Sequence, residues 1–62
     1  MSVKRRDLVR LLEQGGFRLL REGGNHSIYT NGDKVVPVKR HQTLDRITAN
    51  AILKQAGLAP SF

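Results

Sequence analysis

The glycines restrict the fold of this chain more than any other feature, because they divide its 62 residues into short segments. Gly15-Gly16 follows a segment with helical periodicity, and glycine accepts the left-handed conformation at a helix C-terminus without steric cost. Gly23-Gly24 predicts a turn, and Asn31-Gly32 is the strongest short signal for a hairpin. Gly57 ends a second helical segment. The sequence therefore predicts two helices separated by short strands.

Length and composition narrow the class of protein further. A chain of this size buries only roughly 60% of the surface that its unfolded form exposes, so we expect one domain over residues 1–62, with a thin core and no deep cavity. The absence of cysteine excludes disulfides and thiolate metal sites. The N-terminal segment has no uninterrupted apolar run, which argues against a signal peptide or a membrane span. We therefore expect a cytoplasmic protein.

Two segments have the spacing of amphipathic helices. In Ser2 to Gln14 apolar residues recur at i, i+3 and i+4, and Ser2 is the expected N-cap. In Asp45 to Ala56 the apolar residues again form one stripe, with Asp45 or Thr48 as the cap. Leu58 is expected to fold back as the hydrophobic partner of the C-terminal glycine motif.

Three segments between the helices predict strands: Phe17 to Glu22, His26 to Thr30 and Lys34 to Val38. Pro37 has no N–H for a ladder, so it predicts an edge position or a strand end. Strict alternation places His26 on the same face as Ile28. We therefore expect His26 at the rim of the apolar face or turned away from it by a bulge, two alternatives that the sequence leaves open.

These elements predict an α+β fold with the order α-β-β-β-α. The sheet is expected to be antiparallel and three-stranded, with both helices on one face. The other face is then open to solvent or to a partner.

The charge of the chain favours a polyanionic partner. It has 11 lysines and arginines against 5 aspartates and glutamates, a formal net charge of +6 at pH 7, and nucleic acid is the commonest polyanion in the cytoplasm. A generic basic protein is the alternative. The basic residues are scattered among apolar positions, which indicates a charged face of a folded domain. They are Lys4 to Arg6, Arg10, Arg18, Arg21, Lys34, Lys39 to His41, Arg46 and Lys54.

Several other residue types give weaker indications. Two histidines and scattered acidic residues give no metal-ligand spacing, so we expect no metal and no cofactor. Tyr29 is more typical of packing than of base stacking, which usually uses several aromatic residues. Lys4 to Arg6 suits either phosphate contacts or the solvated start of a helix.

Four motifs in register resemble the HicA family of toxin ribonucleases. They are "LLEQGGF" at the end of the first helix, "GNHSIY" at the second strand, "VPVKRH" at the third strand and "ILKQAGL" at the end of the second helix. The resemblance covers Lys4 to Leu58. It implies a fold like that of double-stranded-RNA-binding domains and an RNA-cleaving toxin of a toxin–antitoxin pair.

The resemblance also implies a catalytic residue and a partner. The family's functional histidine lies in a Gly-Ser-His element, which matches Gly24-Asn25-His26 here, with Asn25 in place of serine. Other members also carry a histidine at the position of His41, to which we assign no catalytic role. The implied partner is a HicB-type antitoxin, and the implied substrate is mRNA.

The chemistry of RNA cleavage is consistent with this assignment. The 2′-hydroxyl is a built-in nucleophile that needs a base and positive charge around the phosphate, and no metal is required. Histidine titrates near cytoplasmic pH and suits His26 to proton transfer.

We expect five residues to bind the substrate. The N–H groups of Gly23 and Gly24 would approach a phosphate closely, and Arg21, Lys39 and Arg40 would supply charge. The group that protonates the leaving 5′ oxygen stays open among His26, water and His41. The competing hypothesis is a non-catalytic RNA-binding module, or an inactive toxin that only binds its antitoxin.

Overall fold

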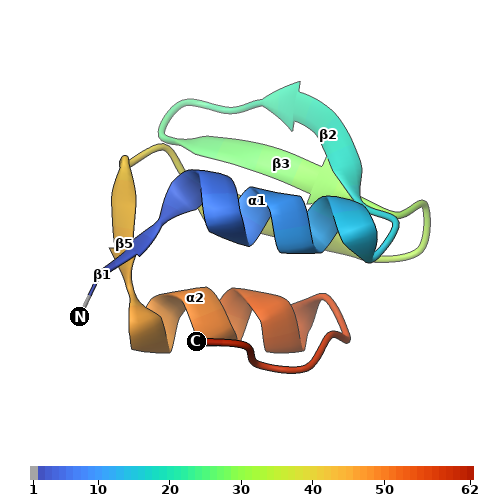
Figure 1. The fold of residues 1–62 in the computed structure, drawn as a ribbon. Coiled ribbons are helices and arrows are strands. Elements are labelled where there is room, and N and C mark those ends of the chain that lie inside the picture. The colour runs from blue at the N-terminus through green and yellow to red at the C-terminus, as the bar shows by residue number, and fades with distance from the viewer. Residues whose placement is uncertain (1) are drawn as a thin grey trace.

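The computed structural model describes residues 2–62 and contains two helices and five strands (Figure 1). In chain order they are β1 (Ser2–Lys4), α1 (Arg5–Gln14), β2 (Arg18–Glu22), β3 (His26–Thr30), β4 (Val35–Lys39), β5 (Thr43–Asp45) and α2 (Arg46–Gln55). The predicted α-β-β-β-α order is confirmed. The short strands β1 and β5 are additional.

The main sheet is antiparallel, with the strand order β2-β3-β4. Strand β3 is central, and β4 is an edge strand, as Pro37 predicts. The β3–β4 ladder runs without interruption from His26 opposite Lys39 to Thr30 opposite Val35. The register of β2 against β3 shifts at Leu20, where a bulge occurs. The bulge therefore lies in β2, and His26 is in a regular strand.

Both helices lie on the same side of the main sheet (Figure 1), as expected. Leu8 and Leu12 of α1 and Leu53 of α2 share one core with Val36 and Val38 of β4. Neither helix in the described residues 2–62 is long and apolar enough to cross a membrane.

The inward face of β3 is the opposite of the one that alternation suggested. Ser27 and Tyr29 are 1% and 7% exposed and face the core, which confirms Tyr29 as a packing residue. His26 and Ile28 lie on the other face and are half-buried. Isoleucine is the more apolar residue, but Tyr29 fills more volume and Ser27 finds a hydrogen-bond partner inside. His26 therefore does not lie at the rim of the core.

The predicted helix start at Ser2 is wrong. Ser2–Lys4 forms β1, which pairs with β5 so that Val3 lies opposite Leu44. Both of these side chains are buried, and helix α1 begins at Arg5, whose N–H donates to the Gln42 carbonyl. Burial of an apolar pair outweighs one further helical turn, and a three-residue strand is too short to show its own periodicity.

The helix ends follow the glycine signals. Gly16 has a φ of +91° and Gly57 one of +78°, the left-handed conformation expected after a helix. The Leu58 N–H donates to the Leu53 carbonyl at 2.8 Å, and its side chain packs against the core, which confirms that Leu58 folds back. At the other end of α2, Asp45 is the N-cap, and its carboxylate accepts from the Thr48 N–H at 2.8 Å.

The hairpin between β3 and β4 has a longer loop than the Asn31-Gly32 signal suggested. The Asn31 side-chain oxygen accepts from the N–H groups of Asp33 and Lys34, and Gly32 has a φ of +93°. Because these bonds hold Lys34 in the loop, β4 begins at Val35 and ends at Lys39, one residue later than predicted. This offset places Lys39 directly opposite His26.

Candidate active site

An open groove of roughly 500 Å³ lies where β3 begins and β4 ends. Antiparallel pairing brings these two strand ends together, so residues separated by more than ten positions line one surface. The lining residues are Gly24, Asn25, His26, Lys39, Arg40 and His41. We call this surface the histidine groove.

The histidine groove is basic. Lys39 and Arg40 are cationic, His26 and His41 contribute two imidazoles, and no acidic residue is among the described residues that line it. Lys39, Arg40 and His41 are exposed, and His26 is half-buried. Such a groove attracts an anion and presents an imidazole to it.

The glycine turn before His26 is held by backbone hydrogen bonds. The Gly23 N–H donates to the His26 carbonyl at 2.7 Å, and a Cβ at Gly23 would lie 3.2 Å from that oxygen. Glycine at position 23 is therefore explained by close backbone approach, since its φ is not positive. This hydrogen bond also commits the Gly23 N–H to the turn.

Gly24 differs from Gly23, because the fold itself does not require a glycine there. Its φ is not positive, and a Cβ built on it would meet no atom within 4 Å. Gly24 is exposed and lines the histidine groove. Its missing side chain leaves room for a ligand to approach the backbone.

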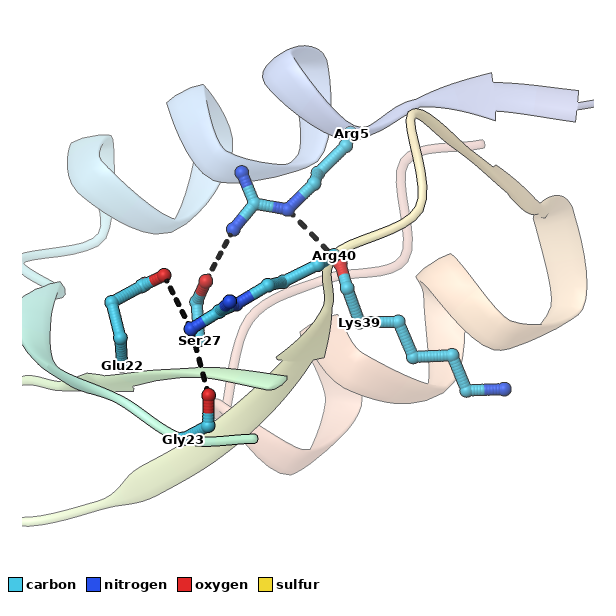
Figure 2. A network of polar contacts seen from close by, with 6 residues as sticks. All are labelled: Arg5, Glu22, Gly23, Ser27, Lys39 and Arg40. Carbon is cyan, nitrogen blue, oxygen red and sulfur yellow. Dashed lines mark hydrogen bonds and ion pairs between the residues drawn. The ribbon is translucent and has the colours of Figure 1, made fainter. Parts of the chain in front are cut away.

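Arg40 ties the glycine turn to the segment that follows β4 (Figure 2). Its guanidinium Nη2 donates to the Gly23 carbonyl at 2.7 Å and lies 2.9 Å from a carboxylate oxygen of Glu22. Its backbone N–H donates to the Asn25 carbonyl at 3.3 Å. Arg40 therefore shapes the groove as well as lending it charge.

Arg5, at the start of α1, holds the two strands that carry His26 and Lys39 (Figure 2). Its Nε donates to the Lys39 carbonyl at 3.0 Å, and its Nη2 donates to the Ser27 hydroxyl at 2.7 Å. Arg5 is therefore neither a solvated helix start nor a free phosphate ligand. Sequence reasoning missed this role because alternation placed Ser27 on the outward face of its strand, whereas the buried Ser27 hydroxyl needs a polar partner.

The histidine groove gathers four of the six residues that the sequence nominated, namely His26, Gly24, Lys39 and Arg40. Gly23 lies just outside it. Arg21 is exposed on β2 opposite Ile28 and does not line the groove.

His41 lines the same groove as His26. The sequence alone favoured a solvated loop histidine, and His41 is indeed exposed. What sequence reasoning could not supply is that His41 and His26 line one groove, because that depends on where β4 ends. No group of three potential metal ligands occurs among the described residues.

The comparison with protein families matches residues 5–58 to the model of the HicA toxin of bacterial toxin–antitoxin systems. No significant match occurs among curated proteins or among solved structures. The matched range covers most of the chain, from the first residue of α1 to Leu58, which follows α2. The chain therefore belongs to the HicA toxin family.

Proposed function

We propose that this protein is a metal-independent endoribonuclease, the mRNA-cleaving toxin of a type II toxin–antitoxin pair, with His26 as its general acid/base. The observation that carries the proposal is the position of His26 opposite Lys39 in a basic groove, in a chain of the HicA family. Residues 1–62 would form the toxin domain, and the substrate implies that it acts in the cytoplasm.

The proposed reaction uses the nucleophile that RNA itself carries. The His26 imidazole accepts the proton of the 2′-hydroxyl as the 2′ oxygen bonds to the adjacent phosphorus. The bond between phosphorus and the 5′ oxygen then breaks, and that oxygen takes up a proton. The products are a 2′,3′-cyclic phosphate and a 5′-hydroxyl, and the reaction needs neither a metal nor an external oxidant.

The other groove residues would stabilise the phosphate during this reaction. Lys39, the strand partner of His26, would supply positive charge where negative charge develops on the non-bridging oxygens. Gly24 would allow the phosphate close to the backbone. Arg40 contributes charge but is partly neutralised by Glu22. Arg21 and Gly23 would act less directly. Arg21 would contact a phosphate farther from the cleaved bond, and Gly23 would shape the turn before His26.

His41 is the residue that we propose for the second proton transfer. It lines the same groove as His26, and a protonated imidazole is a suitable acid for the leaving 5′ oxygen. His41→Ala should lower the rate of cleavage of a defined RNA by about 100-fold or more, the usual contribution of a general acid.

As a HicA toxin, the protein has a cognate antitoxin. We propose that this antitoxin is of the HicB type and that it blocks RNA access to the histidine groove. The open groove and its lack of acidic lining among the described residues favour an acidic segment of the antitoxin as the blocking element.

Induction in cells tests the proposal. Wild type should stop growth and shorten cellular mRNA, whereas His26→Ala should do neither. A wild type that arrests growth with intact RNA would contradict the ribonuclease proposal. A wild type that binds RNA but never cleaves it would favour the non-catalytic module.

Two controls sharpen the experiment. Circular dichroism of purified His26→Ala should match wild type, because the side chain is outside the core. Cleavage by the purified protein should survive an excess of chelator. Loss of cleavage in chelator, restored by a divalent cation, would overturn the metal-independent mechanism.

A further inference from the structure

A second groove adjoins the histidine groove on the far side of Arg40. It has a volume of roughly 630 Å³ and lies between the start of α1 and the segment that joins β4 to β5. Its lining residues are Lys4, Arg5, Arg6, Arg40, Gln42 and Thr43. We call it the N-terminal groove.

The two grooves form one continuous surface because Arg40 lines both. A chain molecule whose phosphate lies beside His26 would therefore enter the N-terminal groove as it passes Arg40. A small anionic substrate would occupy the histidine groove alone.

The N-terminal groove carries cations that the fold does not neutralise. The side chain of Arg6 is 73% exposed, and its closest carboxylate, on Asp7, is 4.0 Å away at the outer limit of an ion pair. Asp7 lines a neighbouring hollow, which Lys4 and Arg6 also line, and is not among the lining residues of the N-terminal groove. Lys4 is exposed, and no acidic residue is among the described residues of the lining.

The floor and one wall of the N-terminal groove are held in place by hydrogen bonds. The Arg5 guanidinium is committed to Ser27 and to the Lys39 carbonyl, so Arg5 fixes α1 against the sheet. The Arg5 N–H donates to the Gln42 carbonyl at 3.0 Å, while the Arg40 N–H binds the loop before β3. The segment from Arg40 to Gln42 is thus anchored at both ends. Binding of a ligand in this groove would therefore cost little conformational entropy in that segment.

We propose that the N-terminal groove binds the backbone of single-stranded RNA next to the cleaved bond, with Lys4 and Arg6 on its phosphates. Gln42 and Thr43 would hydrogen-bond to 2′-hydroxyls or base edges. This inference rests on the proposed ribonuclease function, and it adds a substrate requirement: RNA must extend beyond the reacting phosphate for tight binding.

The test compares two substrate lengths and two pairs of charge-removing substitutions. Lys4→Gln with Arg6→Gln removes the proposed phosphate contacts. Arg10→Gln with Lys54→Gln removes the same charge from exposed sites on α1 and α2 that line neither groove. A trinucleotide spans only the reacting phosphate and its neighbour, and a 15-nucleotide RNA reaches both grooves.

The K4Q/R6Q variant should raise KM for the 15-nucleotide RNA by about tenfold, with kcat unchanged and trinucleotide cleavage unaffected. Loss of two phosphate contacts should reduce the slope of log affinity against log salt by about 1.4, since each contact to single-stranded nucleic acid contributes about 0.7. The R10Q/K54Q pair should change KM much less.

Equal effects of the two pairs, or equal effects on both RNA lengths, would overturn the inference while wild-type cleavage still upheld the proposed function. If wild type cleaved neither RNA, the proposed function would fail. RNA binding by the groove would then be tested separately, by measuring the affinity of His26→Ala for the 15-nucleotide RNA with and without K4Q/R6Q. Weaker binding with K4Q/R6Q would support the inference, and unchanged binding would reject it. Weakened antitoxin binding with unchanged RNA binding would assign the surface to the antitoxin and reject the inference.

Discussion

Arg5 and Arg40 are both near the histidine groove, but their guanidinium groups have different partners. The planar guanidinium of Arg5 joins β3 to β4, because it donates to the Ser27 hydroxyl and to the Lys39 carbonyl. Arg40 lies at the surface between Glu22 and the Gly23 carbonyl. Net charge predicted a basic face, but only these contacts separate the arginines that build the groove from those available to a phosphate.

Arg5→Gln should destabilise the fold by about 1.5–3 kcal/mol, because a hydrogen bond from a charged group is lost and the Ser27 hydroxyl is left buried. The measurement is urea unfolding of Arg5→Gln, Ser27→Ala and the double variant. The double variant should lose less stability than the two single losses added together, since both disrupt the same contact. Additive losses would show that Arg5 and Ser27 are not coupled.

Glycine substitutions should separate structural from functional positions. Gly16→Ala forces a side chain into a left-handed backbone and should lower the free energy of unfolding by about 1–2 kcal/mol, measured by thermal or urea unfolding.

The side chain added by Gly24→Ala meets open space at a φ that is not positive, so the stability of the fold should be unchanged or slightly raised. RNA cleavage by Gly24→Ala should nevertheless fall. Full cleavage by this variant would argue against close approach of the phosphate at Gly24.

At the scale of the elements, the N-cap of α2 should make stability dependent on pH. Hydrogen bonds from the N–H and hydroxyl of Thr48 lower the pKa of Asp45 below its ordinary value of 3.8. A lowered folded-state pKa means that this stabilisation is fully present above about pH 4, the unfolded pKa, and is lost as pH falls through the folded one.

Asp45→Asn keeps a good capping residue but removes the titration. The difference in unfolding free energy between wild type and Asp45→Asn should therefore be constant from pH 7 to about pH 5 and should change as pH falls below about 4. A difference that stays constant down to pH 2 would contradict the role of the Asp45 carboxylate.

The sequence predicted the main elements because glycines and apolar spacing act locally. Gly16 and Gly57 end their helices and Asp45 begins α2 through contacts within a few residues. Strand β1 was not predictable, because its stability comes from Leu44, about forty positions away. The inward face of β3 also involves a partner that is distant in sequence, since the buried Ser27 hydroxyl accepts a hydrogen bond from Arg5, 22 positions away.

At the scale of the whole molecule, the fold turns scattered basic residues into two adjoining grooves. His26 and Lys39 were both nominated from the sequence, but their pairing depends on the register of β3 against β4. The N-terminal groove depends on pairing of β1 with β5, which brings Lys4 next to Thr43. Local patterns carry no information on either register, so the sequence could nominate residues but not arrange them.

One measurement tests the central claim most directly: the rate at which purified wild type and His26→Ala cleave a defined RNA. The control substrate is the same RNA without the 2′-hydroxyl at the cleaved position. Wild type should produce a 2′,3′-cyclic phosphate, should bind but not cut the deoxy-substituted RNA, and should outpace His26→Ala by about 100-fold or more. Cleavage of the deoxy-substituted RNA, or a His26→Ala rate equal to that of wild type, would contradict the account.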